Sequence, residues 1–112
     1  MKSTKRSSPL LHGTLEALVM KSLANGPRHG YAIGRWIEDG TGDVIQVEEG
    51  SLYPALYRME SRGWIEAEWG QTETNRKAKF YRLTRDGRRR LAVETERWAA
   101  FSAAISRVLL PA

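Results

Sequence analysis

The chain has 112 residues, of which 41% are hydrophobic and 28% are charged. This length and composition fit one domain of about 100–150 residues and exclude both a second catalytic domain and a wholly disordered chain. The absence of cysteine excludes disulfides, thiolate metal sites and cysteine nucleophiles. We expect a cytoplasmic protein with no membrane partner, because no apolar stretch reaches the roughly 18 residues of a membrane helix and residues 1–9 lack the apolar stretch of a signal peptide.

Positive charge is concentrated in one part of the sequence. The 18 lysines and arginines outnumber the 13 aspartates and glutamates, which gives a net charge of +5. Residues 76–90 hold eight basic residues and one acidic residue, whereas residues 40–75 hold two and seven. A local basic stretch is typical of an anion-binding surface, but a solvated face with no further function has the same pattern.

The first forty residues predict an arm and two helices. Residues 1–9 are polar and basic and end in proline, so we expect a flexible arm. Thr14 is the expected N-cap of a first helix, which ends at the turn Asn25-Gly26-Pro27. A second helix is expected from about His29 to Asp39, with Gly40 as its stop.

The clearest helical pattern begins near Glu49–Ser51 and ends at Gly63. The residues that share its apolar face, at positions i, i+3, i+4 and i+7, are Leu52, Ala55, Leu56 and Met59. The opposite face carries Tyr53, Pro54, Tyr57, Arg58 and Ser61. Pro54 is expected in the opening turns, where its missing N–H costs no internal hydrogen bond. Two tyrosines, an arginine and a serine exceed what burial requires, although helical tyrosines are also common packing residues.

A long-looped antiparallel hairpin is predicted next. Residues 64–69 alternate as in a half-buried strand, and residues 80–83 form the second strand. The apolar side of the first strand consists of Ile65, Ala67 and Trp69. The intervening residues 70–79 form a polar loop. Its return side is basic and carries Arg76, Lys77 and Lys79.

The sequence predicts a long last helix. Thr84 is its expected N-cap, with Asp86 in the first turn, and neither glycine nor proline interrupts residues 88–110. At 1.5 Å per residue such a helix reaches about 40 Å and exceeds a small core. Its apolar stripe consists of Leu91, Trp98, Phe101, Ile105 and Val108. We expect a second copy of the chain to cover this stripe, the alternative being a helix that folds back onto its own domain.

Three helices, a hairpin with a basic loop and a further helix form the element order of a winged helix. We therefore expect a mainly α fold with a small β-hairpin. It comprises a flexible basic arm (1–9), a winged helix-turn-helix domain (10–83) and a C-terminal dimerisation helix (84–112). In this fold the third helix enters the major groove of double-stranded DNA and the hairpin loop, or wing, reaches the flanking phosphates. Arg88, Arg89 and Arg90 are left as the solvated face of the last helix.

From about Leu10 to Leu110 the sequence resembles the PadR-type transcriptional regulators. The segments that carry the resemblance are GTLEALVMKSL at 13–23, HGYAI at 29–33, EGSLYPALYRMESRGWI at 49–65 and KFYRLTRDGRRRL at 79–91. The single terminal helix is similar to the shorter branch of the family. The resemblance implies a homodimeric, usually repressing regulator, whose last helix supplies the dimer contacts and often a surface for a small-molecule ligand. Two recognition helices in such a dimer would match an inverted-repeat operator.

The resemblance also assigns site residues. The recognition-helix motif is matched by Ser51, Tyr53, Pro54 and Tyr57, and the basic loop matches the wing. The start of the second helix, where backbone N–H groups can meet a phosphate, is matched by His29, Gly30 and Tyr31. Trp98 matches an aromatic that lines the dimer pocket in drug-sensing members, which implies a planar aromatic effector. A tryptophan that only fills the dimer core is the alternative.

Other functional classes find less support in the sequence. With two histidines, no cysteine and no glycine-rich phosphate loop between a strand and a helix, the chain offers no catalytic residue, metal site or cofactor site. A protein-interaction or RNA-binding module on the same fold is the main alternative. The polar face of the third helix and the basic wing together favour DNA. Glu73, in the wing, has no role in this scheme.

Overall fold

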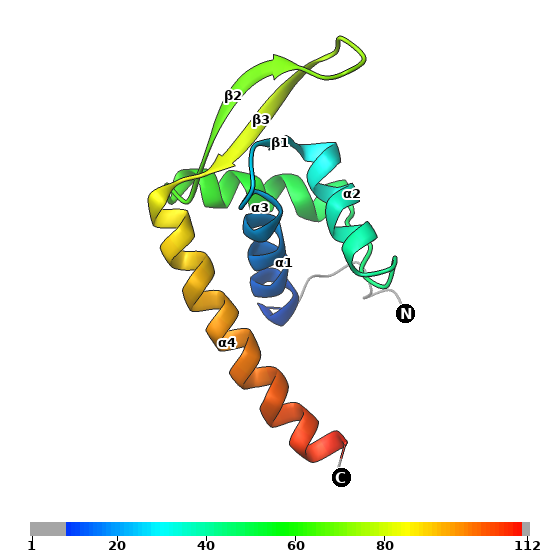
Figure 1. The fold of residues 1–112 in the computed structure, drawn as a ribbon, viewed down its shortest axis with the longest axis vertical. Coiled ribbons are helices and arrows are strands. Elements are labelled where there is room, and N and C mark those ends of the chain that lie inside the picture. Colours follow the sequence, from blue (N-terminus) through cyan, green and yellow to red (C-terminus); the bar gives the residue numbers. More distant parts are fainter. Residues whose placement is uncertain (1–8, 111–112) are drawn as a thin grey trace.

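The computed structural model describes residues 9–110. Its elements follow in the order α1 (Pro9–Ser22), β1 (Arg28–His29), α2 (Gly30–Gly40), α3 (Glu49–Ser61), β2 (Ile65–Gln71), β3 (Lys77–Leu83) and α4 (Arg85–Leu109). The hairpin of β2 and β3 rises above α3, and α4 descends from the end of β3 past α1 (Figure 1). The expected winged-helix order of elements is therefore confirmed.

The core lies where α1, α2 and α3 meet the base of the hairpin. Its buried residues are Leu15, Val19, Met20, Leu23, Ile33, Ile37, Leu52, Ala55, Leu56, Met59, Ile65, Tyr81 and Leu83. All four residues predicted for the apolar face of α3 are among them. Burial of a large aliphatic side chain contributes about 1.5–3 kcal/mol relative to exposure, so this cluster holds the three helices together.

The start of α1 differs from the prediction. The helix begins at Pro9 rather than after Thr14, so Thr14 is not its N-cap. A proline fits the first helical position because its missing N–H has no partner to lose there. The predicted arm otherwise lies outside the described residues. The helix ends at Ser22, and the turn that follows includes Gly26 at φ 149°, a backbone conformation that other residues rarely adopt.

The start of α2 is tied to the hairpin. His29 caps the helix, because its Nδ1 accepts a hydrogen bond from the Ala32 N–H at 3.3 Å. The two residues of β1 also pair with β3, His29 opposite Phe80 and Arg28 opposite Tyr81. Strand β1 was not predicted from the sequence, because two residues carry no alternation. The helix itself runs to Gly40, one residue beyond its predicted end.

Helix α3 continues through Pro54 to Ser61. Pro54 is the sixth helical residue, so the expectation that it costs no internal hydrogen bond is wrong. The carbonyl of Gly50 lacks the N–H that residue 54 would normally donate. The helix stops as predicted before Gly63, whose φ of 78° suits a glycine.

The hairpin is longer and its loop shorter than predicted. Three strands form an antiparallel sheet in the order β1-β3-β2, with Ile65 opposite Leu83 and Gln71 opposite Lys77. The loop is confined to residues 72–76, where Thr72 Oγ1 accepts the Arg76 N–H at 3.1 Å. The expected ten-residue loop is wrong because the outer strand residues leave the core and need no apolar alternation. Trp69, predicted to be half-buried, is 62% exposed for the same reason.

The joint between the hairpin and α4 explains the sequence LTRDG at 83–87. Thr84 caps α4 as predicted, accepting the Gly87 N–H at 3.0 Å, and its hydroxyl donates to the Gly63 carbonyl at 2.6 Å. A Cβ on Gly87 would overlap the Trp64 carbonyl oxygen, so only glycine fits this position. The joint thereby fixes the direction in which α4 leaves the body.

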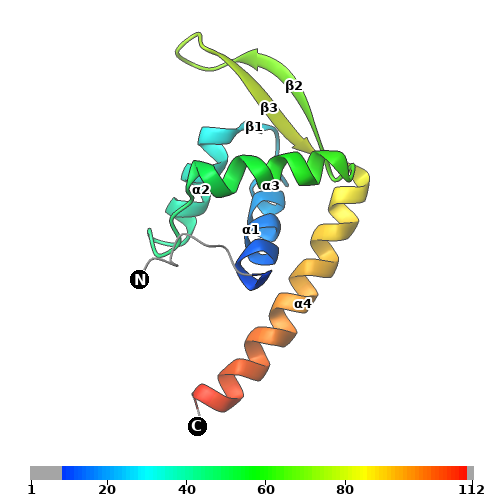
Figure 2. The ribbon, with the colours of Figure 1, turned by 180° about the vertical axis from the view of Figure 1, so that it is seen from behind.

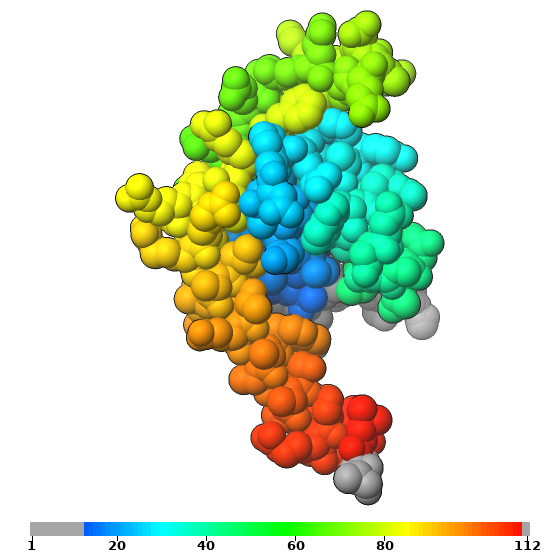
Figure 3. Space-filling model, in the orientation of Figure 1, coloured from blue at the N-terminus to red at the C-terminus, as the bar shows by residue number. Residues whose placement is uncertain are grey.

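Helix α4 leaves the rest of the fold. It is a single helix of 25 residues that does not fold back on its own domain (Figures 1 and 2). Its first half packs along α1, and Leu91 packs against the core. In the space-filling view the last turns stand clear of the other helices (Figure 3). Within residues 9–110, no helix is long and apolar enough to cross a membrane.

Candidate nucleic-acid interface

The outward side of α3 is a row of exposed residues opposite the core. The row consists of Gly50, Pro54, Tyr57 and Ser61, which recur at the three- and four-residue spacing of one helical face. Tyr57 is the most prominent, with 73% of its surface exposed. From behind, α3 lies in front of α1, so no other helix covers this side (Figure 2). The row meets the steric requirement for a helix that enters a groove.

Arg58 and Ser51 lie on a different flank of α3. The Nε of Arg58 donates to Glu16 Oε2 on α1 at 3.1 Å, and Nη1 of Arg62 is 3.9 Å from the same oxygen. Arg58 therefore bridges α3 to α1 instead of extending outward. Ser51 is half-buried. Of the predicted polar face, only Tyr53, Pro54, Tyr57 and Ser61 are exposed.

Tyr53 lies on the flank of α3 that meets the start of α2. It is 45% exposed, and a Cβ at Gly30 would lie only 2.5 Å from its hydroxyl oxygen. The side chain of Tyr53 thus fits over a backbone that has no side chain. Beneath it, burial raises the pKa of Tyr81, and the nearby Glu60 carboxylate and Tyr53 act in the same direction. Tyr81 is therefore uncharged at neutral pH.

One face of the hairpin turns toward α3. Strand alternation and register place Trp69, Lys77, Lys79 and Tyr81 on the same face. Lys79 Nζ lies 3.7 Å from Glu60 of α3, which identifies this face as the inner one. Lys77 Nζ lies 5.8 Å from the centroid of the Trp69 ring, within the range of a cation–π contact.

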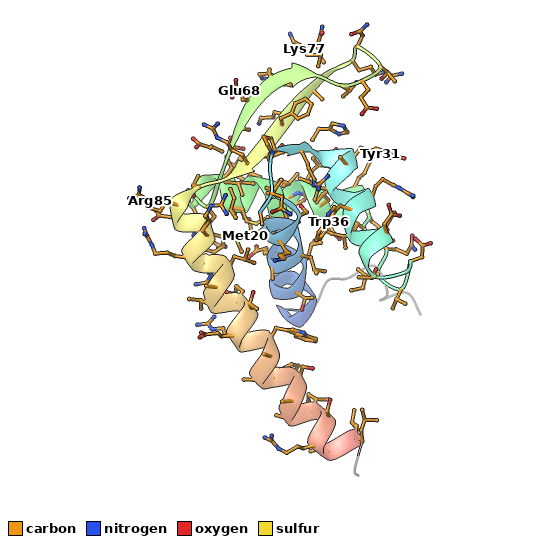
Figure 4. The ribbon with its side chains drawn as sticks, in the orientation of Figure 1. Met20, Tyr31, Trp36, Glu68, Lys77 and Arg85 are labelled. Atoms are coloured by element: carbon orange, nitrogen blue, oxygen red, sulfur yellow. The ribbon has the colours of Figure 1, made fainter. Side chains whose placement is uncertain are left out.

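An open groove of about 1210 Å³ separates the wing from α2. The predicted site residues that line it come from β1, α2, α3 and the hairpin and are His29, Tyr31, Tyr53, Arg76, Lys77 and Lys79. Figure 4 shows two of them, Lys77 on the hairpin and Tyr31 at the start of α2. Pro54, Tyr57 and Ser61 lie outside the groove, on the adjoining outward row of α3. The fold thus brings the predicted groups from α2, α3 and the wing to one side of the molecule.

The basic stretch at 76–90 divides between two surfaces. No ion pair joins Arg76 or Lys77 to any residue between 13 and 110, so both charges are available in the groove. By contrast, Arg89 pairs with Asp86, and Arg90 Nη2 pairs with Glu94 Oε2 at 2.5 Å, on α4 away from the groove. The location of the charges thus supports a ligand-facing role only for the wing. Glu73 also lines the groove, and no contact explains it.

A comparison with known families identifies the chain. The model of the transcriptional regulator PadR-like family matches residues 19–93. The chain belongs to this family. As a PadR-like protein it is a transcriptional regulator, which implies DNA binding, and not an enzyme. The expected family and fold class are confirmed. Within the described residues, no group of three or more histidines and carboxylates could hold a metal ion.

Solved structures share the PadR-like fold along almost the whole chain. A transcriptional regulator from Clostridium thermocellum superposes with a TM-score of 0.81 at 26% identity, covering 91% of this chain and 99% of that one. A PadR family transcriptional regulator from Eggerthella lenta gives 0.74 at 31% identity, with 92% and 88% coverage. In sequence, the chain is 30% identical over 92 residues to "Uncharacterized protein X" of Lysinibacillus sphaericus, covering 82% of this chain and 84% of that protein.

In this PadR-like chain, the C-terminal half of α4 exposes an apolar stripe. Trp98 is 51% exposed, and Val108 is 77% exposed. The rings of Trp98 and Phe101 lie 6.2 Å apart between centroids at an angle of 41°. Ile105 continues the stripe at 43% exposure. No residue between 13 and 110 covers these side chains, whereas Leu91 at the upper end of the predicted stripe packs against the core.

Two features of this surface in the PadR-like chain could not be predicted from the sequence. Strand alternation alone places Trp69 on a half-buried side, and only the length of the hairpin reveals its exposure. The family resemblance assigns Gly30 to the start of the second helix, where backbone N–H groups can meet a phosphate, but it does not indicate a contact with Tyr53. Its contact with Tyr53 spans 23 positions in sequence, so no local pattern could indicate it.

Proposed function

We propose that this chain is a homodimeric repressor that binds an inverted-repeat operator in double-stranded DNA and releases it on binding a small-molecule ligand. The observation that carries the DNA-binding part is the groove, because it unites the start of α2, Tyr53 of α3 and the wing. That groups distant in sequence, from α2, α3 and the hairpin, line one groove supports a shared ligand. The exposed row on α3 adjoins the groove and supplies the helix that fits a major groove.

Each element has a distinct task in this proposal. Tyr57 and Ser61 meet base edges or the backbone in the major groove, while Arg76 and Lys77 neutralise phosphates across it. A further phosphate, between the DNA contacted by α3 and that contacted by the wing, meets the start of α2, where Gly30 and Tyr31 line the groove. The first N–H groups of a helix and the positive end of its dipole favour an anion there.

Dimerisation through α4 is supported by its exposed stripe. A second copy that covers Trp98, Phe101 and Ile105 would remove three large apolar side chains from water. The resulting twofold symmetry predicts half-sites about one helical turn, roughly 34–36 Å, apart or a multiple of it. Ligand release follows if an effector changes how the two α4 helices pack, because the joint at Gly87 connects α4 directly to the end of α3 and the wing.

The effector proposal rests on the aromatic pair of Trp98 and Phe101. Two rings at a 41° angle on an exposed face fit a planar aromatic compound between subunits. Such compounds should quench tryptophan fluorescence in the wild type and much less in Trp98→Ala. Trp36, Trp64 and Trp69 remain in the variant, so equal quenching in both proteins would mean that the signal comes from them. Trp98 would then be assigned to the dimer core alone.

A competition assay decides between DNA, RNA and protein as the partner. Labelled double-stranded DNA from the region upstream of the protein's own coding sequence is titrated, with unlabelled duplex, single-stranded DNA or RNA as competitor. We expect the duplex to compete best, and a scrambled duplex to compete less well. Preference for RNA would contradict the proposal. Absence of binding to all three would favour the protein-interaction alternative.

A further inference from the structure

Trp69 is a large aromatic side chain of the hairpin that is not part of the hydrophobic core. The ring is 62% exposed on the inner face of β2, four residues beyond the buried Ile65. Burial of an aromatic side chain stabilises a fold, and Trp69 forgoes most of this gain in the isolated chain. A polar residue would suit this position in the folded monomer equally well. The fold therefore holds an apolar surface where a ligand can cover it.

Cationic groups flank the ring on the neighbouring strand. Lys79 is the direct cross-strand partner of Trp69, and Lys77 Nζ lies 5.8 Å from the ring centroid. Both lysines share the inner face with Trp69. An apolar ring with two lysines on the neighbouring strand complements a polymer that alternates apolar sugars with phosphates. It does not complement an acidic peptide equally, because a peptide offers no regular apolar surface between its charges.

The opposite face of the hairpin holds Trp69 in position. Phe80 packs edge-on against His29 of β1, the residue that caps α2, with 5.3 Å between ring centroids. A Cβ at Gly70 would lie 3.0 Å from Phe80 Cδ1, so the Phe80 ring also rests on the backbone next to Trp69. These contacts tie the middle of the wing to the start of α2. Trp69 is thus presented by a fixed hairpin, and little order has to be gained on binding.

We propose that the Trp69 ring packs against a deoxyribose of the DNA backbone, between the phosphates that Lys77 and Lys79 neutralise. This inference rests on the proposed function and adds an uncharged contact to it. Lys79 exchanges its 3.7 Å pairing with Glu60 for a phosphate, and Lys77 remains extended over the ring. The contact contributes affinity without sequence preference, because every nucleotide of the duplex presents the same sugar.

The test compares affinity and salt dependence in four variants of the full chain, one of them a control. Trp69→Ala should weaken duplex binding about tenfold, as is typical when an interface aromatic is truncated, and Trp69→Phe by much less. Because no charge is removed, the slope of log K against log salt should stay that of the wild type. Lys77→Ala should instead reduce that slope by about one phosphate. Val44→Ala, 83% exposed on the loop before α3, serves as control for a loss of exposed apolar surface.

Three outcomes would overturn the inference. Wild-type affinity in Trp69→Ala would remove the contact, and a slope reduced as in Lys77→Ala would show that Trp69 only positions the lysine. If Trp69→Ala lost affinity for single-stranded DNA but kept its affinity for the duplex, the ring would be assigned to stacking on bases and not to a sugar contact. Matching urea-unfolding midpoints of wild type and Trp69→Ala exclude misfolding as a cause. If the wild type binds no duplex, the proposed function fails, which is a separate result.

Discussion

Position 30 requires glycine because of a contact within the proposed DNA-binding surface. Its neighbour Tyr53 lies 23 positions away in sequence, yet a Cβ at residue 30 would lie 2.5 Å from the Tyr53 hydroxyl oxygen and 2.9 Å from Cε1. No positive φ demands glycine here. The absence of a side chain lets Tyr53 pack over the start of α2 and face the groove.

Gly30→Ala should destabilise the fold by about 1–3 kcal/mol, because the added methyl group overpacks this contact. In a Tyr53→Ala background the same substitution should cost much less, since the clashing atoms are absent. Urea unfolding of the four proteins in this cycle measures the coupling. Gly40→Ala at the other end of α2, with no atom within 4 Å of its Cβ, is the matched control. Additive energies at positions 30 and 53 would contradict the contact.

The unpaired positive charges of the wing lie on its loop and return strand. Arg76 and Lys77 are without ion pairs among residues 13–110, whereas Lys79 faces Glu60 at 3.7 Å. Glu66 and Arg82 pair at 3.3 Å on the outer face of the hairpin. The inner face is therefore more positive than the wing's total charge suggests. This asymmetry fits the proposed contact between the wing and a phosphate backbone.

Replacing both Arg76 and Lys77 by alanine should weaken binding to all duplex sequences alike. The slope of log K against log salt should fall by about two, one for each phosphate that is no longer neutralised. Arg89→Ala is the matched control, because Arg89 is paired with Asp86 on α4 and does not line the groove. An unchanged slope in the double variant, or an equal reduction in Arg89→Ala, would refute the role assigned to the wing. Filter binding at four salt concentrations is sufficient.

The joint between the hairpin and α4 is the second element with a clear physical purpose. Thr84 ties the end of β3 to the turn between α3 and β2. Its N–H and hydroxyl both donate to the carbonyl of Trp64, and the hydroxyl also donates to that of Gly63. Arg90 of α4 lies over the Trp64 ring at 4.9 Å, and Arg62 lies over it at 5.2 Å. A change in the direction of α4 would therefore be transmitted to the end of α3 and to the wing.

At the scale of the whole molecule, α4 makes the chain elongated. The principal extents are 51 × 35 × 23 Å, and the last turns of α4 extend past the helical body (Figure 3). A helix that leaves its own core cannot bury its apolar stripe within the same chain. Hydrophobic burial favours a second copy, since the stripe of one chain offers the same apolar surface as that of the other.

Ile105→Glu should convert the proposed dimer into a monomer, because a charge at the centre of the stripe would be desolvated without a partner. Light scattering after size exclusion gives the mass directly. Ala103→Glu on the opposite, exposed face of α4 is the matched control and should remain dimeric. Operator affinity should fall in Ile105→Glu, because a monomer contacts a single half-site. A dimeric Ile105→Glu protein would place the interface elsewhere.

The sequence by itself determined the order of the four helices and the hairpin, because the signals for them are local. The apolar face of α3 follows from Leu52, Ala55, Leu56 and Met59, which lie within two turns. The N-cap at Thr84 and the stop at Gly63 depend on a few neighbouring residues. The family resemblance followed from such segments as well. The expected start of α1 is wrong, since Thr14 has the composition of a cap but lies inside a helix that Pro9 already begins.

Only the tertiary structure decided which side chains face the groove. Arg58 lies at the edge of the polar side of α3, and its guanidinium pairs with Glu16 of α1, 42 residues away, instead of extending outward. Trp69 alternates correctly for a half-buried strand, but the hairpin at that point has left the core. Gly30 is explained by Tyr53, and β1 exists only because β3 lies beside it. In each case the deciding contact joins residues that are distant in sequence. Local patterns contain no information about such contacts, because they arise only when the elements pack.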